Sequence, residues 1–229
     1  MRKKTAILTA GLAVLIVGGG VGYGLYDYYA GNHVQVESVI AAPAEGGTGE
    51  AVDMELINGV WNIDPSSTVY FSVTTSKETV NFAVNNVSGS WTIDTADPSR
   101  MAGEGKIDLN AIDSGNSQRD GHIKEADYFN VEETPEATFT ATSFEGVPAE
   151  WTEGQPFPFK MSGTMTVKGI SKEVTFEGNG VYEGGQIKLE SDTAVTFSDF
   201  GMTNPHRVVL DTENTVTVQL RLTLTAQPA

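Results

Sequence analysis

Hydrophobic and polar residues alternate with a period of two through most of the chain after residue 59. The clearest run lies near the C-terminus, where Val216, Val218, Leu220, Leu222 and Leu224 are separated by polar residues. Successive side chains of an extended strand point to opposite faces, so this pattern predicts strands with one buried face. Other strands are predicted at 69–73, 80–84, 87–93, 105–109, 137–144, 161–167, 172–182 and 186–197.

Short glycine-containing turns separate several of these runs. Gly169 lies between two alternating segments, and Gly184 and Gly185 lie between two others. Such spacing is typical of hairpins that join sequential antiparallel strands. Many strands with little helix between them predict an all-β protein, either an up-and-down barrel or a sandwich.

The first 30 residues differ from the rest of the chain. Arg2, Lys3 and Lys4 precede a run without charged residues from 5 to 26, which is long enough to cross a hydrocarbon core of about 30 Å as a helix. We predict a signal anchor or transmembrane segment at 1–30, with the remainder outside the cytoplasm because basic residues stay inside. Cleavage of this segment would instead give a secreted protein.

Residues 31–58 are rich in Ala, Gly, Pro and Glu and show no sustained apolar period. This composition predicts a flexible linker. The folded domain is therefore expected at 59–226.

Composition and charge exclude several classes of function. The net charge of −16 argues against nucleic-acid binding, which needs basic residues to replace the counterions of phosphate. The chain has no Cys and few His residues, so neither a disulfide nor a zinc site is expected. No serine lies in a nucleophile elbow, and no glycine-rich phosphate loop is present. We predict no enzymatic activity, no catalytic residue, no metal and no cofactor.

A charged segment in the middle of the chain predicts a short helix near 117–127. Ser117 and Asp120 have the spacing of a capping box, in which each side chain satisfies a backbone N–H at the helix start. Gly121 should keep the helix short. Tyr128 and Phe129 follow it and are expected to close one end of a barrel.

Several segments of the chain resemble the YceI-like domain family. They are Arg119-Asp120-Gly121-His122-Ile123, Tyr128-Phe129, Pro135, the strand 139–143, the segment 163–174 and the opening Trp61-Asn62-Ile63-Asp64. The segment 196–205 resembles some actinobacterial members. The chain departs from the family at Ser66-Ser67 and Thr75, where histidines are common, so contacts made by those histidines do not carry over.

The resemblance implies a lipocalin-like, antiparallel up-and-down barrel of about eight strands that binds a polyisoprenoid lipid such as a polyprenol or isoprenoid quinone. The protein would carry, store or shield this lipid outside the cytoplasm, anchored to the membrane by its N-terminus. The apolar residues expected to contact the lipid are Phe71, Val73, Phe82, Phe139, Met161, Met165, Phe176 and Phe197.

Arg119, Asp120 and His122 are the candidates for contact with a lipid headgroup or for the rim of the barrel. Their residue types also suit a structural role, in which Asp120 caps the helix and the other two hold it against loops. The alternative function is a non-enzymatic module of the cell envelope, with a barrel core filled by its own side chains. An eight-stranded barrel is just wide enough for either a packed core or one small ligand.

Overall fold

Strands dominate the computed structural model, which describes Gly24 and residues 31–41, 49–204 and 211–227. The described helices are α2 (Met54–Ile57), α3 (Ser117–Ile123) and three 3-10 helices at Pro98–Arg100, Leu109–Ala111 and Phe197–Phe200. The strands are β1 (Gly59–Ile63), β2 (Thr68–Thr75), β3 (Thr79–Val84), β4 (Val87–Ile93), β5 (Ala102–Asp108), β6 (Glu136–Glu145), β7 (Phe157–Val167), β8 (Ile170–Glu183), β9 (Gln186–Thr196) and β10 (Thr212–Ala226).

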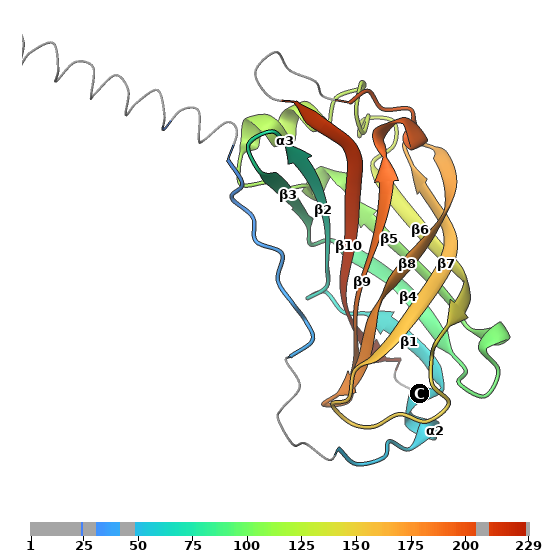
Figure 1. The fold of residues 1–229 in the computed structure, drawn as a ribbon. Coiled ribbons are helices and arrows are strands. Elements are labelled where there is room, and N and C mark those ends of the chain that lie inside the picture. The colour runs from blue at the N-terminus through green and yellow to red at the C-terminus, as the bar shows by residue number, and fades with distance from the viewer. Residues whose placement is uncertain (1–23, 25–30, 42–48, 205–210, 228–229) are drawn as a thin grey trace, which may run out of the picture.

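These ten strands form one antiparallel sheet that closes into a barrel (Figure 1). Two pairs of strands share positions in the ring. β1 and β2 pair with different parts of β10 and so occupy the same position. β4, which pairs with β1, and β3, which pairs with β2, share the next position. The barrel therefore has eight positions, closed by pairing of β1 with β10. The predicted all-β, antiparallel barrel of about eight strands is confirmed.

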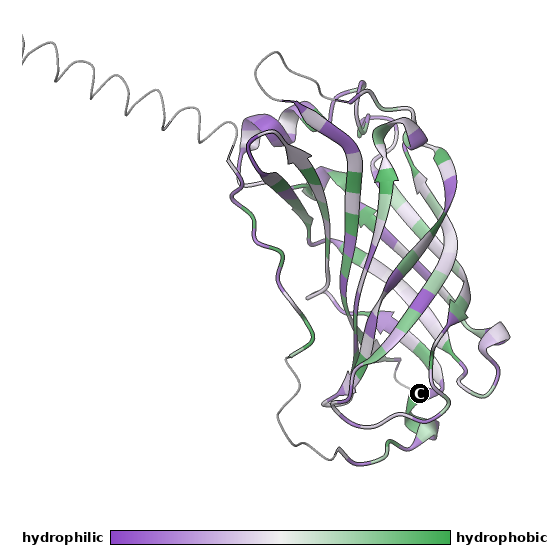
Figure 2. Ribbon diagram, in the orientation of Figure 1, coloured by the Kyte–Doolittle hydropathy of each residue, from purple (hydrophilic) through white to green (hydrophobic). Residues whose placement is uncertain are grey.

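The alternation predicted from the sequence is the alternation of burial in the barrel. Along β7 every second residue from Phe159 to Val167 is buried, and hydrophobic and hydrophilic bands alternate along the strands in Figure 2. The turn between β7 and β8 has positive φ at Lys168 (54°) and Gly169 (72°), and the next hairpin has positive φ at Gly184 and Gly185. Positive φ at both central positions is the hairpin geometry that matches the twist of the strands.

One end of the barrel, called here the closed end, is filled by large side chains. Ile57 of α2 is fully buried there, and the Trp61 indole donates a hydrogen bond to its carbonyl oxygen (2.8 Å). Trp91 packs edge-on against Phe144, and Trp151 lies 4% exposed beneath them. This end needs no ligand to complete its packing.

The opposite end, called here the mouth, is covered by α3 and the loops around it. Among the described strands, β3 pairs only with β2, so its second edge faces these loops. A two-residue bridge joins Ala83 of β3 to Asp113, just before α3. The loop before the helix thus pairs with the edge of β3 where a neighbouring strand would otherwise lie.

The structure differs from the predicted linker at both of its described ends. Residues 31–41, which we call the N-terminal strap, run along the outside of the barrel from α3 (Figure 1). Residues 49–53 lie at the closed end, where the Val52 amide donates to the Trp151 carbonyl. Polar side chains of the strap form hydrogen bonds with the barrel wall. Composition alone does not show whether such side chains bind the protein or water.

The predicted anchor at 1–30 lies outside the described residues except for Gly24. In the part of the chain that the structure describes, no helix has the length and apolar character needed to span a membrane.

Candidate functional site

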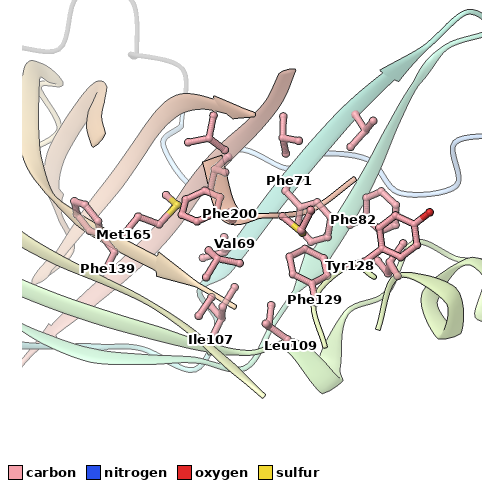
Figure 3. A pocket seen from close by; sticks show the side chains of 18 of the residues that line it. Val69, Phe71, Phe82, Ile107, Leu109, Tyr128, Phe129, Phe139, Met165 and Phe200 are labelled. Carbon is pink, nitrogen blue, oxygen red and sulfur yellow. The ribbon is translucent and has the colours of Figure 1, made fainter. Parts of the chain in front are cut away.

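A cavity of about 950 Å³ occupies the half of the barrel nearest the mouth (Figure 3). Its wall is almost entirely apolar and comes from most of the strands, the α3 segment and the 3-10 helix before β10. Its volume is at the upper end of the range typical of sites for small ligands. The lining side chains labelled in the figure are Val69, Phe71, Phe82, Ile107, Leu109, Tyr128, Phe129, Phe139, Met165 and Phe200.

The cavity exists because two neighbouring strands present small residues to the interior. Gly103 and Gly105 of β5 and Ala137 of β6 line it. A Cβ atom placed on Gly105 would have only ordinary contacts, 3.5 Å from the nearest Ile63 methyl carbon. On Gly103 the Cβ would lie 3.0 Å from the Trp91 ring, so this tryptophan forms the floor.

Aromatic rings give the cavity a defined shape. Phe71 and Phe82 are stacked on adjacent strands with their ring centroids 4.6 Å apart, and Phe129 meets Phe71 edge-on at 5.5 Å. Across the cavity Phe139 and Phe176 are also edge-to-face, at 5.0 Å. Such pairs hold one another in place, so the wall is preformed rather than collapsed.

Seven of the eight residues predicted to contact a lipid line this cavity: Phe71, Val73, Phe82, Phe139, Met165, Phe176 and Phe197. Met161 does not. It is 1% exposed and lies opposite Phe144 and Phe176 in the register of β7, one step closer to the packed end. The prediction that Met161 faces the interior of the barrel was correct. Whether an inward side chain lines the cavity also depends on how far along the barrel the packed core extends.

Arg119 of α3 lies at the rim of the cavity and is half-buried. Its Nε donates to the Ser114 hydroxyl (2.9 Å), and one Nη donates to the carbonyls of Gly31 (3.0 Å) and Ser114 (3.3 Å). The guanidinium lies over the Phe82 ring, 5.8 Å from its centroid. Burial lowers the pKa of Arg119, and the charges of Asp120 and Glu78 partly offset this effect. An arginine stays protonated after such a shift, so a positive charge remains at the rim.

Asp120 has a structural role, but it does not form the predicted capping box. Asn116 is the N-cap of α3, because its side chain accepts hydrogen bonds from the amides of Gln118 and Arg119. Asp120 is 8% exposed and accepts from the amide (3.0 Å) and hydroxyl (2.5 Å) of Ser114. It does not line the cavity. The buried carboxylate therefore folds the preceding loop against the helix and holds Ser114 beneath Arg119.

His122 lines the outer rim and is partly exposed. Its Nδ1 lies 3.1 Å from a Glu125 carboxylate oxygen, and its ring meets Tyr128 edge-on at 4.9 Å. Arg119 and His122 thus stand at the mouth, whereas Asp120 supports them from behind.

Sequence reasoning missed the small residues of β5 and the contribution of Phe200. The inward positions 103, 105 and 107 carry Gly, Gly and Ile, a loss of bulk that signals space inside a barrel. Phe200 follows the last predicted residue of its strand and enters the cavity from a 3-10 helix. Within the described ranges, no group of three or more His, Asp or Glu side chains is arranged to hold a metal ion.

Comparison with known proteins places these features in a family context. Residues 61–224 match the model of the YceI-like domain. Protein YceI of Salmonella newport is 30% identical over 142 residues, which cover 54% of this chain and 70% of that protein.

Two solved structures share the fold. BcnA of Burkholderia cenocepacia superimposes with a TM-score of 0.61 at 18% identity, over 70% of this chain and 98% of that one. A polyisoprenoid binding domain from Saccharophagus degradans, implicated in plant cell wall breakdown, gives a TM-score of 0.58 at 16% identity, over 73% and 98%.

Proposed function

Because the chain belongs to the YceI-like domain family, we propose that it binds the tail of an isoprenoid-type lipid, such as a polyprenol or an isoprenoid quinone, in its barrel. The observation that carries the proposal is the apolar cavity of about 950 Å³ that remains after the closed end is packed. The protein carries, stores or shields this lipid and performs no chemical step on it.

The cavity wall suits a branched hydrocarbon chain. Burial of a methylene group contributes roughly 0.8 kcal/mol, so each five-carbon isoprene unit contributes roughly 4 kcal/mol before the costs of ordering it are subtracted. Flat Phe rings and the flexible Met165 side chain follow the irregular outline of such a chain. Affinity in this arrangement comes from the tail.

The headgroup lies at the mouth, beside Arg119 and His122. A guanidinium donates paired hydrogen bonds to phosphate or carbonyl oxygens, and the imidazole adds a further polar group beside it. These two side chains support selection among headgroups, while the tail is held below them.

The barrel works outside the cytoplasm and next to a membrane in this proposal. Support comes from the uncharged run at 5–26 and the basic residues before it. If the segment is cleaved, the same barrel acts as a secreted carrier.

The deciding experiment is native mass spectrometry of the protein purified under mild conditions and then incubated with polyprenol or quinone. We expect one bound lipid per barrel. Gly105→Phe should abolish the bound mass, because its ring would fill the cavity at a position with free space. The matched control is Thr140→Phe, which adds the same ring to an exposed position of β6.

Loss of binding in both variants, or retention in both, would contradict a site inside the barrel. A wild-type protein that carries no lipid and takes up neither polyprenol nor quinone would contradict the proposed function itself.

A further inference from the structure

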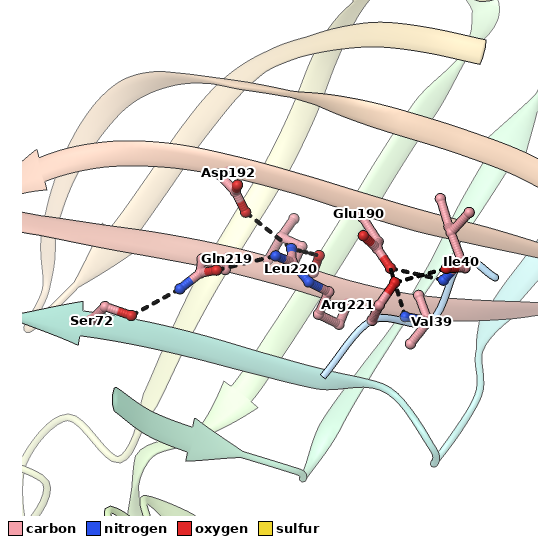
Figure 4. Close-up of polar contacts among 9 residues, drawn as sticks. Val39, Ile40, Ser72, Glu190, Asp192, Gln219, Leu220 and Arg221 are labelled. Atoms are coloured by element: carbon pink, nitrogen blue, oxygen red, sulfur yellow. Dashed lines mark hydrogen bonds and ion pairs between the residues drawn. The ribbon is translucent and has the colours of Figure 1, made fainter. Parts of the chain in front are cut away.

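The N-terminal strap is fixed to the barrel at two places. Near its end the Ser38 hydroxyl and the amides of Val39 (2.6 Å) and Ile40 (2.8 Å) all donate to one oxygen of Glu190 on β9 (Figure 4). Nearer its start the Asn81 side chain donates to the Val34 carbonyl (2.8 Å). Residues 34–40 are thereby held against the outer wall of the barrel.

The start of the strap lies at the rim of the cavity. Gly31 is buried, and its carbonyl accepts a hydrogen bond from Arg119, the cation that lines the mouth. A Cβ atom placed on Gly115, just before α3, would lie 2.6 Å from the His33 Cβ, so the strap packs tightly against this loop. Asn32 also accepts from the backbone amide of Asn81 on the edge of β3 (3.0 Å).

This path brings Gly31, the start of the strap, to the end of the barrel opposite the one where β1 starts. The chain enters β1 from α2 at the closed end, so a chain leaving directly from there would emerge at that end. Residues 31–40 instead extend over roughly 30 Å, about the length of the wall. The strap therefore determines which end of the barrel faces whatever holds residues 1–30.

We propose that the strap orients the barrel with its mouth toward the membrane, so that a lipid passes directly between the bilayer and the cavity. This inference rests on the proposed function and on the anchor predicted at 5–26. Between Tyr26, the end of that run, and Gly31 the chain reaches at most roughly 18 Å. The mouth is thus confined close to the bilayer surface, while the closed end points away.

The competing arrangement has the closed end on the membrane. Leu56 and Val60 are exposed at that end, with 60% and 42% of their surfaces accessible, and both are apolar. The fixed path of the strap favours the mouth, because a closed-end contact would require the contacts at Glu190, Asn81 and Arg119 to break.

The test measures the distance of each end of the barrel from the bilayer. The chain has no Cys, so a single dye can be placed at Asp127→Cys beside the mouth or at Glu150→Cys beside the closed end, both exposed acidic positions. The full chain is reconstituted in phosphatidylcholine vesicles that contain acceptor-labelled headgroups. We expect strong energy transfer from position 127 and weak transfer from position 150, since the ends lie roughly 30 Å apart.

Two variants test whether the strap causes the difference. Asn81→Ala combined with Glu190→Ala removes the side chains that bind residues 34–40. A Gly/Ser replacement of 31–40 removes the Asn32 side chain that accepts from Asn81 and the His33 side chain that packs against Gly115. Either should reduce the difference between the two dyes at least twofold and slow lipid uptake from the vesicles. Asp192→Ala is the matched control, because Asp192 lies on the same face of β9 as Glu190 and pairs with Arg221, not with the strap.

Equal transfer from the two positions in the unmodified strap, stronger transfer from position 150, or failure of the chain to float with the vesicles would overturn the inference. Lipid binding measured in detergent micelles is independent of orientation. Normal lipid binding in micelles, with the mouth not facing the bilayer, would reject only the strap proposal. A mouth that faces the bilayer in a protein that binds no lipid would reject only the proposed lipid-binding function.

Discussion

At the scale of single residues, the most consequential polar group of the site is a carboxylate that faces away from the cavity. Asp120 organises Ser114, and Ser114 in turn accepts from Arg119 through its hydroxyl and its carbonyl. The rim cation is thus positioned by a buried charge that has no access to a ligand. A residue chosen for headgroup binding from its type alone turns out to support its neighbour.

We expect Asp120→Ala to lower the free energy of unfolding by about 1.5–3 kcal/mol, the range for hydrogen bonds to a charged group. Asp127→Ala removes an exposed carboxylate of the same segment and should change it by less than about 0.5 kcal/mol. Urea denaturation of the two variants measures the difference. Equal stabilities would mean that the bonds to Ser114 contribute nothing.

The position of Arg119 at the mouth leads to a separate prediction, a preference for anionic headgroups. A hydrogen bond to a charged group contributes about 1.5–3 kcal/mol, which corresponds to a preference of roughly tenfold or more for a polyprenyl phosphate over the matching polyprenol. Arg119→Met should abolish this preference, measured by competition for the wild-type and variant barrels.

Lys124→Met is the control for that experiment, because it removes another cation of the segment whose ammonium group donates to the Asn110 carbonyl. It should leave the ratio of the two affinities unchanged. A wild-type protein without preference, or an Arg119→Met variant that keeps it, would place the headgroup elsewhere.

At the scale of elements, the strap depends on one carboxylate. Burial tends to raise the pKa of Glu190, but hydrogen bonds from Ser38, Ile40 and Val39 and the charge of Arg221 outweigh it and lower the pKa below its ordinary value of 4.5. A lowered pKa in the folded state means that the contribution is fully present above about pH 4.5 and is lost as the pH falls through the lower, folded value.

The strap should therefore remain bound at neutral and mildly acidic pH and detach only below about pH 4.5. The amide resonances of Val39 and Ile40 in a pH titration would report this change. Asp192→Ala should keep the transition, and Glu190→Ala should remove it. A midpoint at or above 4.5 would show that the carboxylate is not stabilised by these contacts.

We expect the substitution of glycine by alanine to have opposite effects on stability at two positions in different elements. Gly169→Ala places a side chain at a φ of 72° in the hairpin between β7 and β8 and should destabilise the protein by about 1–2 kcal/mol. Gly121→Ala lies in α3, where a Cβ atom meets nothing within 4 Å, and should stabilise it by up to about 1 kcal/mol. Thermal unfolding measures both, and equal signs would contradict the assigned conformations.

The regular elements were predictable from the sequence because their alternation has one physical cause, the burial of one face of each strand. The strands around Val218, Met165 and Val73 agree with the prediction to within a few residues. The predicted capping box of Ser117 and Asp120 was wrong, since Asn116, one position earlier, is the N-cap and accepts from the amides of Gln118 and Arg119. The strap was unpredictable because its partner Glu190 is about 150 residues away in the chain.

The cavity was only partly predictable. Seven of the predicted lining residues lie on its wall because their face of the strand was correct. The floor of the cavity is formed where Trp91 packs against Gly103 and where Met161 lies opposite Phe144 and Phe176. These contacts between strands depend on three-dimensional packing. The face of a residue follows from periodicity, but its depth along the barrel does not.

At the scale of the whole molecule, an unfilled cavity links stability to ligand concentration. A lipid that binds only the folded barrel should add about 2.7 kcal/mol to the free energy of unfolding at a free concentration of 100 times Kd. For a barrel of this size the increase in Tm should be roughly 5–10 °C. Thermal unfolding in micelles with and without polyprenol measures it.

Gly105→Phe should lose this increase, and Thr140→Phe should keep it. A polyprenol-dependent Tm in the filled variant would indicate binding on the outer surface.

The strap also sets an order of events during synthesis. Residues 31–40 leave the ribosome before any strand, yet their partners lie on β3, in α3 and on β9, the last of which is among the final parts of the barrel to be made. A segment made early consequently completes its native contacts late. In the proposed arrangement, the contacts to Glu190 form only once β9 is in place, so only a completed molecule would present its mouth in a fixed direction.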